Sequence, residues 1–221
     1  IAEDPEAVLS GYAILDGAGL DRPLLLAGWT RHALSEITVH DLATGEQVGQ
    51  VPLPGLGTAG GLGERPEGGH EAWFAYTDYT TSPVVLRFDA RDSSVTTWAA
   101  APGSVEVPAA TARQVTYQSK DGTPVRMLII NSGSGSGDAP AEPRPTILYG
   151  YGGFDISLTP AYSPNVLTWV SSGGVYVVAN IRGGGEYGPR WHQAALKQNR
   201  HKAYEDMAAV VARRAIEGDA R

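Results

Sequence analysis

The sequence predicts two architectures in one chain, an all-β first half built from four-stranded units and an α/β second half. Three observations lead to this prediction. Short alternating strands fill the first hundred residues or so, a hairpin pattern recurs among them at the period of a propeller blade, and apolar strands alternate with helices from residue 146 onward. The boundary is expected near residue 110, so that residues 1–110 form one domain and residues 111–221 the other.

Short alternating runs fill residues 23–100. β-Branched and aromatic residues are separated there by clusters of Gly, Pro, Asp and Ser, which is typical of antiparallel strands joined by tight turns. The expected strands begin at Leu24, Ser35, Glu46, Ala72, Pro83 and Ser94. The 28 glycines and 15 prolines also favour a turn-rich fold of many short strands.

Two hairpins of this half resemble each other. TVHDLATGEQV and LRFDARDSSVT each contain an apolar strand that ends in Asp, a polar turn and a second strand. Their aspartates, Asp41 and Asp89, are 48 positions apart, close to the roughly 40–50 residues of one propeller blade. This period favours four-stranded blades over a sandwich, in which turns recur about every 8–12 residues without a longer period.

The second half begins with a strand expected over residues 123–131, after the turn Lys120-Asp121-Gly122. Residues 132–145, rich first in Gly and Ser and then in Pro, predict a surface loop. Apolar strands then begin at Thr146 and Val175. Their alternation with helices indicates a parallel sheet covered on both faces.

Two helices are expected in this half, over residues 164–172 and 204–217. Ser163 and Pro164 provide an N-cap and a first-turn proline for the first helix, and a pair of glycines at 173 and 174 ends it. The second helix ends at Gly218. Its core side is expected to carry Met207, Val210, Val211 and Ile216.

Composition excludes several classes of protein. The net charge of −7 and the lack of a basic stripe argue against a nucleic-acid partner. The absence of cysteine excludes disulfides, cysteine-ligated zinc and a cysteine nucleophile. No run of about 18 apolar residues is present, so no membrane partner is expected. The chain opens without Met or a signal pattern, and we expect an internal fragment of a soluble, cytoplasmic protein.

Three motifs invite interpretations that their context does not support. Residues 55–60 match G-x-G-x-x-G, but the glycine-rich sequence that follows cannot open a helix, so a propeller loop is expected. The glycines after Arg182 could form an anion nest, but a local pair between Arg182 and Glu186 is the favoured explanation. His70 and Glu71 belong to no recognisable ligand set, and we expect neither a metal nor a cofactor.

Several longer segments carry a resemblance to a known family. These are YQSKDGTPVRM, LYGYGGFDISLTPAYS, GGVYVVANIRGGGEYGPRWH and KQNRHKAYEDM, with VPLPGLGTAGGLG upstream. The chain resembles the prolyl oligopeptidase family, serine peptidases built from a seven-bladed β-propeller and an α/β-hydrolase domain. The resemblance implies that residues 1–110 are the last blades of the propeller. It makes residues 111–221 the N-terminal part of a truncated hydrolase domain.

The resemblance also assigns two site residues. Tyr151 corresponds to the family's phenol that donates to the oxyanion of the tetrahedral intermediate, and Phe154 to an aromatic ring that lines the pocket for the substrate proline. A fixed donor aimed at developing negative charge is suited to the first role, and an apolar ring to the second. From the residues alone, Tyr151 could equally end a buried strand, and Phe154 could pack in the core.

No G-x-S-x-G nucleophile elbow occurs in the 221 residues. The resemblance places the serine, aspartate and histidine of the triad downstream, so the chain alone is expected to be inactive and to need the remainder of its polypeptide. The implied substrates are short proline-containing peptides. Two alternatives remain open: an oligopeptidase specific for basic or acylated peptides, and a non-catalytic propeller protein with a hydrolase-like domain that only binds.

Overall fold

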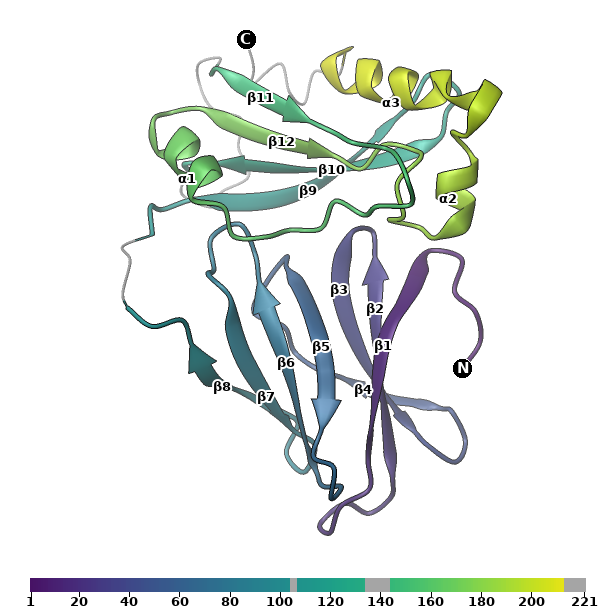
Figure 1. Cartoon of the computed structure of the whole chain (residues 1–221), viewed down its shortest axis with the longest axis vertical. Helices are drawn as coiled ribbons and strands as arrows, with labels where there is room; N and C mark the ends of the chain where they lie inside the picture. Colours follow the sequence, from purple (N-terminus) through teal and green to yellow (C-terminus); the bar gives the residue numbers. More distant parts are fainter. Residues whose placement is uncertain (104–106, 134–143, 213–221) are drawn as a thin grey trace. The chain divides into compact units, whose positions relative to one another are not determined.

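The computed structural model describes residues 1–103, 107–133 and 144–212 (Figure 1). The chain divides into two compact units, the first made of Ile1–Ser104 with Thr159–Tyr162 and the second of Val105–Leu158 with Ser163–Arg221. Each unit contains its own cluster of buried hydrophobic side chains. The domain boundary expected at residue 110 stays a prediction.

Two four-stranded antiparallel sheets make up the first unit, and the strands of each follow one another in sequence order. The strands of the first sheet are β1 (Ala7–Leu15), β2 (Leu24–Arg31), β3 (Leu34–Asp41) and β4 (Gln47–Gln50). Those of the second are β5 (Thr58–Glu64), β6 (Glu71–Thr77), β7 (Val84–Asp89) and β8 (Ser94–Ala100). All six strands expected from the sequence in this region therefore form.

The two similar hairpins occupy equivalent places, because each joins the third strand of its sheet to the fourth. Both aspartates bind the turn that follows them. Asp41 Oδ1 accepts hydrogen bonds from the backbone N–H groups of Ala43 and Thr44, each at 2.9 Å, and Asp89 Oδ1 accepts one from Arg91 at 3.0 Å. The recurring Asp is thus explained by turn chemistry, since a carboxylate can satisfy backbone donors that the turn leaves free.

The first strand of each sheet, β1 and β5, was not predicted from the sequence. The loop expected for the glycine-rich stretch at residues 55–60 was wrong for its second half, because β5 begins at Thr58 and pairs with β6. Glycine is a weak strand former, and the partner strand supplies the order that the local sequence lacks. The register shift between Gly60 and Gly63 marks a bulge there.

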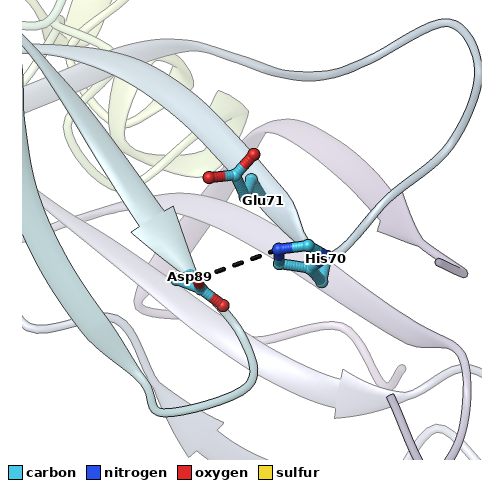
Figure 2. Close-up of side chains that lie close together, drawn as sticks. All are labelled: His70, Glu71 and Asp89. Carbon is cyan, nitrogen blue, oxygen red and sulfur yellow. Dashed lines mark ion pairs between the residues drawn. The ribbon is translucent and has the colours of Figure 1, made fainter. Parts of the chain in front are cut away.

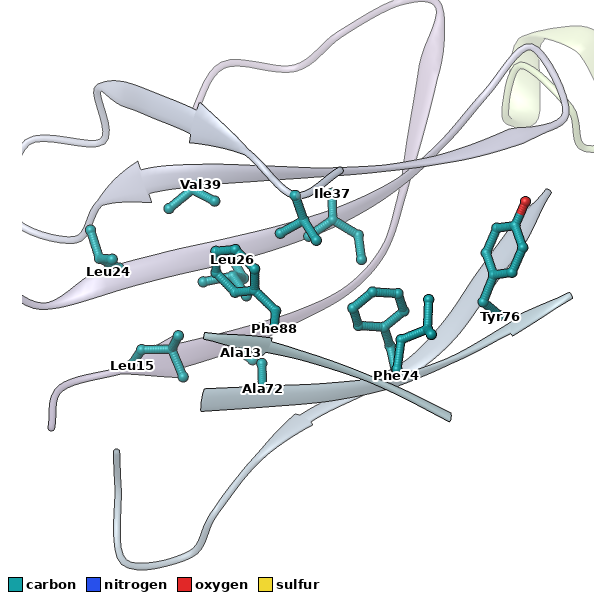
Figure 3. Close-up of a cluster of buried hydrophobic side chains, with 12 residues drawn as sticks. Ala13, Leu15, Leu24, Leu26, Ile37, Val39, Ala72, Phe74, Tyr76 and Phe88 are labelled. Carbon is teal, nitrogen blue, oxygen red and sulfur yellow. The ribbon is translucent and has the colours of Figure 1, made fainter. Parts of the chain in front are cut away.

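The core of the first unit is formed by both of its sheets. Figure 3 draws side chains from β1, β2 and β3 together with side chains from β6 and β7. Leu26, Phe74 and Phe88 are almost fully buried in this cluster. Burying one such side chain stabilises a fold by about 1.5–3 kcal/mol, so the cluster joins the two sheets into one unit.

The second unit contains a four-stranded sheet of order β11-β12-β10-β9. Its strands are β9 (Thr111–Gln118), β10 (Pro124–Asn131), β11 (Thr146–Tyr149) and β12 (Val175–Ala179). The strands that begin at Thr146 and Val175, β11 and β12, are parallel as expected, whereas β10 runs antiparallel to both β9 and β12. A tight turn at residues 119–123 joins β9 to β10 as a hairpin and gives these two strands opposite directions.

The helices of this unit are α1 (Pro164–Ser171), α2 (Pro189–Gln193) and α3 (His201–Ala212), with a 3₁₀ turn at Lys197–Asn199. The predicted N-cap is confirmed, since Ser163 Oγ accepts a hydrogen bond from the Val166 N–H at 3.4 Å. Met207 and Val210 contact the core, but Val211 is 68% exposed, because it lies a quarter-turn beyond that face. Ile216 and Gly218 lie outside the described residues, as does most of the loop expected at 132–145. Among the described helices, none has the length and apolar character needed to cross a membrane.

Candidate active site

Two glycine-rich turns lie at the same edge of the second unit's sheet. One follows β11 at residues 150–153, and the other follows β12 at residues 183–185. Because β11 and β12 are parallel neighbours, both turns leave the sheet at its carboxyl edge, which is where α/β folds place their ligands. The two glycine-rich turns, far apart in sequence, are therefore brought together.

The two turns contact each other through glycine backbone. Gly152 has a φ of +56°, and a Cβ atom added there would lie 2.5 Å from Ile181 Cγ1. Gly183 has a φ of +104°, and an added Cβ would collide with the Gly152 carbonyl. Both positions thus require glycine for conformation and for space. This contact fixes the backbone on either side of Tyr151.

Tyr151 and Phe154 form an exposed aromatic pair on the first of these turns. Their ring centroids are 6.4 Å apart with an interplanar angle of 28°. Tyr151 is 40% exposed and Phe154 is 81% exposed. Phe154 therefore does not pack in the core, and that competing interpretation was wrong. Its contact with a substrate proline and the donor role of Tyr151 stay predictions.

The backbone under this pair is strained. Phe154 and Asp155 have φ angles of +53° and +59°, in the left-handed region that side-chain-bearing residues rarely adopt. Such a residue costs about 1–3 kcal/mol and is found chiefly where a binding or catalytic site holds it. A large apolar ring held in this way toward solvent is a feature of a ligand-binding surface.

A pocket of about 480 Å³ lies beside the aromatic pair, and the whole of it belongs to the second unit. Its side-chain walls are Tyr151, Phe154, His192, Ala195, Leu196, Lys197 and Arg200. Arg200 donates a hydrogen bond from Nη1 to the Gly152 carbonyl. His192 Nδ1 lies 2.7 Å from the Gly183 carbonyl oxygen and 3.1 Å from the Asp155 backbone nitrogen. Two pocket side chains thus hold the two glycine turns.

Arg182 does not pair with Glu186, and the local pair expected from the sequence was wrong. Its guanidinium instead donates to Asp206 of α3, with Nη2 2.6 Å from Oδ1, and to Asp121 of the β9–β10 turn, with Nη1 2.6 Å from Oδ2. Arg182 and Asp206 are buried. Hydrogen bonding to Arg182 lowers the pKa of Asp121 well below its usual range. This ion network joins the end of β12 to helix α3 and to a hairpin turn.

Glu186 is buried on the other side of the same turn. Its Oε1 accepts hydrogen bonds from the Leu158 N–H at 3.0 Å and from Asn180 Nδ2 at 3.3 Å. Its Oε2 has no hydrogen-bond partner among the described residues. Burial raises the pKa of this carboxyl above its ordinary value. Glu186 therefore holds the loop after Phe154 in place and does not neutralise Arg182.

A second group of ionisable side chains lies in the first unit (Figure 2). His70, Glu71 and Asp89 each offer a ligand atom within 4.8 Å of the others, an arrangement that the sequence analysis missed because β7 brings Asp89 opposite Glu71. Both carboxylates already have cationic partners, since Arg91 Nη2 lies 2.7 Å from Asp89 and Arg65 Nη2 lies 2.9 Å from Glu71. The hydrogen bond from Arg91 is the main reason that the pKa of Asp89 falls to about 2. The group is an ion-pair network.

Comparison with known proteins identifies the family. The family model "Prolyl oligopeptidase family" matches residues 160–218. A prolyl endopeptidase of Elizabethkingia miricola is 40% identical over 185 residues, which cover 83% of this chain and 25% of the relative. Prolyl oligopeptidase A of Amanita bisporigera is 32% identical over 222 residues, covering 95% of this chain and 27% of the relative. The chain thus spans about a quarter of the length of these relatives.

Solved structures of the same family are also similar to this chain. A prolyl endopeptidase structure superposes with a TM-score of 0.81 at 33% identity over 99% of this chain and 30% of that one. The apo structure of prolyl oligopeptidase B from Galerina marginata superposes with a TM-score of 0.80 at 25% identity over 100% of this chain and 31% of that one. The chain belongs to the prolyl oligopeptidase family. The propeller and hydrolase fold of that family accounts for the two kinds of sheet seen in the two units.

Within this prolyl oligopeptidase fold, the sequence analysis missed the cationic wall of the pocket. Lys197 and Arg200 belong to the segment KQNRH, which carried part of the family resemblance but was given no chemical role. They follow α2, a five-residue helix too short to show a hydrophobic period. A proline at the start of that helix, Pro189, was the one available signal.

Proposed function

We propose that Tyr151 is an oxyanion-hole donor of a serine peptidase that cuts short peptides after proline. The observation that supports this best is its position: a half-exposed phenol at the carboxyl edge of the sheet, on a glycine turn that contacts a second one, beside a pocket. Two of the relatives described above are called prolyl endopeptidase and prolyl oligopeptidase A. Cleavage after proline is part of the proposal.

The proposed chemistry is acyl transfer. When a serine attacks the carbonyl carbon of the proline residue, the carbonyl oxygen gains negative charge, and the Tyr151 hydroxyl donates a hydrogen bond to it. A preorganised donor of this kind lowers the barrier by about 2.7–4 kcal/mol. Phe154 offers an apolar face to the proline ring, because a pyrrolidine ring has no polar group to satisfy.

The remaining parts of the proposal concern the rest of the protein. The serine, aspartate and histidine of the triad are proposed to lie outside these 221 residues, which contain no G-x-S-x-G motif. The two four-stranded sheets are proposed to be the last blades of the propeller. We place the protein in the cytoplasm, and cell fractionation would test that location. The 221-residue chain alone should not hydrolyse peptides, because losing a triad costs many orders of magnitude in rate.

Replacement of Tyr151 by Phe tests the proposal in the protein expressed from its complete reading frame. On a chromogenic peptide with proline before the scissile bond, Tyr151→Phe should lower kcat by about 10²–10³-fold with little change in KM, because the donor acts mainly in the transition state. Tyr149→Phe is the matched control, since Tyr149 is also a half-exposed tyrosine of this segment. Equal kcat values for the Tyr151 variant and the unmodified enzyme would exclude the donor role.

A further inference from the structure

The pocket beside Tyr151 has an unbalanced charge. Lys197 and Arg200 both line it, and among the described residues that line it none carries a carboxylate. The chain as a whole is acidic, with a net charge of −7. Two cations next to each other in such a chain, on the wall of a pocket and without an acidic neighbour there, favour an anionic ligand.

Several other cations of the described chain have an acidic partner. Arg31 lies 2.8 Å from Asp4, Arg91 lies 2.7 Å from Asp89, and Arg182 lies 2.6 Å from Asp206. A larger hollow of about 930 Å³ along β9 and α3 contains a lysine as well, but there Lys120 lies 2.9 Å from Glu205, which lines the same hollow. The pocket beside Tyr151 differs from that hollow, because its described lining places two cations together with no carboxylate.

The backbone holds Lys197 in an unusual conformation. Its φ is +50°, in the left-handed region, at the first residue of the 3₁₀ turn Lys197–Asn199. A lysine rarely adopts this conformation, so the surrounding structure must hold it there. Arg200 is also fixed, because its Nη1 donates to the Gly152 carbonyl and its guanidinium lies 5.5 Å from the centre of the Tyr204 ring. With five N–H donors, this guanidinium retains donors for a ligand.

The rest of the pocket is apolar. Phe154, Ala195 and Leu196 provide its carbon surface, and Leu196 is 38% exposed. A ligand that suits this lining has an apolar body and one anionic end. Among the groups that a peptide carries, carboxylates alone are anionic at neutral pH without modification.

We propose that this pocket binds a carboxylate of the peptide substrate, held by Lys197 and Arg200, while the neighbouring part of the peptide packs on Leu196 and Phe154. The inference rests on the proposed peptidase function, because it places the peptide at Tyr151. The carboxylate has two possible sources, the C-terminus of a short peptide or an Asp or Glu side chain near the scissile bond. Charge-assisted hydrogen bonds contribute about 1.5–3 kcal/mol, equivalent to roughly 10- to 100-fold in specificity.

Three matched peptides distinguish the sources, assayed with the protein expressed from its complete reading frame. All have the same sequence up to the proline, followed by Ala with a free carboxylate, by Ala amide, or by Asp amide. We expect kcat/KM for one or both acidic peptides to exceed that for Ala amide by about 10-fold or more at low salt. The advantage should shrink in 1 M NaCl, because salt screens exposed charges. A free-carboxylate advantage alone identifies the C-terminus as the ligand, and an Asp advantage alone identifies the side chain.

The variant Lys197→Asn tests the residue itself. Asn removes the charge and tolerates a positive φ, so the 3₁₀ turn should keep its shape. The kcat/KM ratio of the preferred acidic peptide to Ala amide should fall at least about 5-fold in this variant, by loss of one charge-assisted contact. Lys197→Arg should retain most of the ratio. Lys202→Asn, on α3 and outside the pocket lining, should keep the full ratio.

Two results overturn the inference: equal kcat/KM for all three peptides in the unmodified enzyme, or the same ratio in the Lys197→Asn variant as in the unmodified enzyme. Failure of the proposed function looks different, because then none of the three peptides is cut. In that case, isothermal titration calorimetry with the acidic and amide peptides decides the inference. Tighter binding of an acidic peptide that Lys197→Asn abolishes supports the site, and equal binding contradicts it.

Discussion

Glu186, in the turn after β12, is a residue whose protonation depends on burial. Glu186 is almost completely buried, and one of its oxygens has no partner among the described residues. Desolvation therefore raises its pKa above the ordinary value. The Glu186 carboxylate accepts a hydrogen bond from the Leu158 N–H and so positions the loop after Phe154. Its burial destabilises the folded state when the carboxylate is charged, and this free-energy cost can be measured.

Glu186→Gln should stabilise the protein at neutral pH. A raised pKa means that the folded state retains a proton that the unfolded state has lost, so stability falls as pH rises from the unfolded pKa, about 4.3, to the higher folded pKa. Above the folded pKa the loss is complete, and Gln, which is always neutral, avoids it. Urea denaturation at pH 4, 5, 6, 7 and 8 should give a free-energy advantage of the variant that grows with pH and then levels off. An advantage that shrinks with rising pH would contradict this account.

The site could be predicted only in part at this scale. The family resemblance indicated Tyr151 and Phe154. The partner of Arg182 could not be predicted, because Asp206 lies 24 positions downstream on a helix whose facing side depends on packing. Glu186, only four positions away, was the obvious local partner, but the three intervening glycines direct it to Leu158 and Asn180.

Elements of the second unit are joined by the network that Arg182 forms. The arginine at the end of β12 binds helix α3 through Asp206 and the β9–β10 turn through Asp121. Asp206 is fully buried, whereas the side chain of Asp121 is 36% exposed. When a buried charge loses its partner, no water can take the partner's place, whereas an exposed charge is solvated by water.

Asp206→Asn should therefore destabilise the second unit by about 3–5 kcal/mol, because Arg182 would be left buried with half of its charge compensation removed. Asp121→Asn should cost about 1 kcal/mol or less, since water can solvate the exposed end of the network. The stability loss of each variant can be measured by chemical denaturation, with hydrogen exchange of the β10 and β12 amides as the probe of the second unit. Equal losses for the two variants would show that burial does not decide the strength of this network.

At the level of elements, patterns with a local cause were predictable. The strands of both hairpins and the Ser163 N-cap follow from residues close to one another in sequence. Elements that depend on a distant partner were not. The glycine-rich β5 is a strand because β6 pairs with it.

The whole molecule comprises two units with separate cores and belongs to a family of peptidases. The division into a β-sheet unit and an α/β unit was predictable, because hydrophobic period and turn composition change along the chain. The chain spans about a quarter of the length of these relatives, so catalysis should be assayed in the complete protein. In that complete protein, we propose, the Tyr151 hydroxyl donates to the oxygen of the carbonyl group that becomes tetrahedral.

The most direct measurement is a crystal structure of the complete protein with a peptidyl-proline aldehyde bound to its nucleophile, since the adduct imitates the tetrahedral intermediate. We predict that the Tyr151 hydroxyl lies about 2.7–3.1 Å from the hemiacetal oxygen, with the inhibitor's proline ring against Phe154. An adduct whose oxygen is bound by other donors, with the Tyr151 hydroxyl beyond about 4 Å and outside hydrogen-bonding distance, would contradict the account.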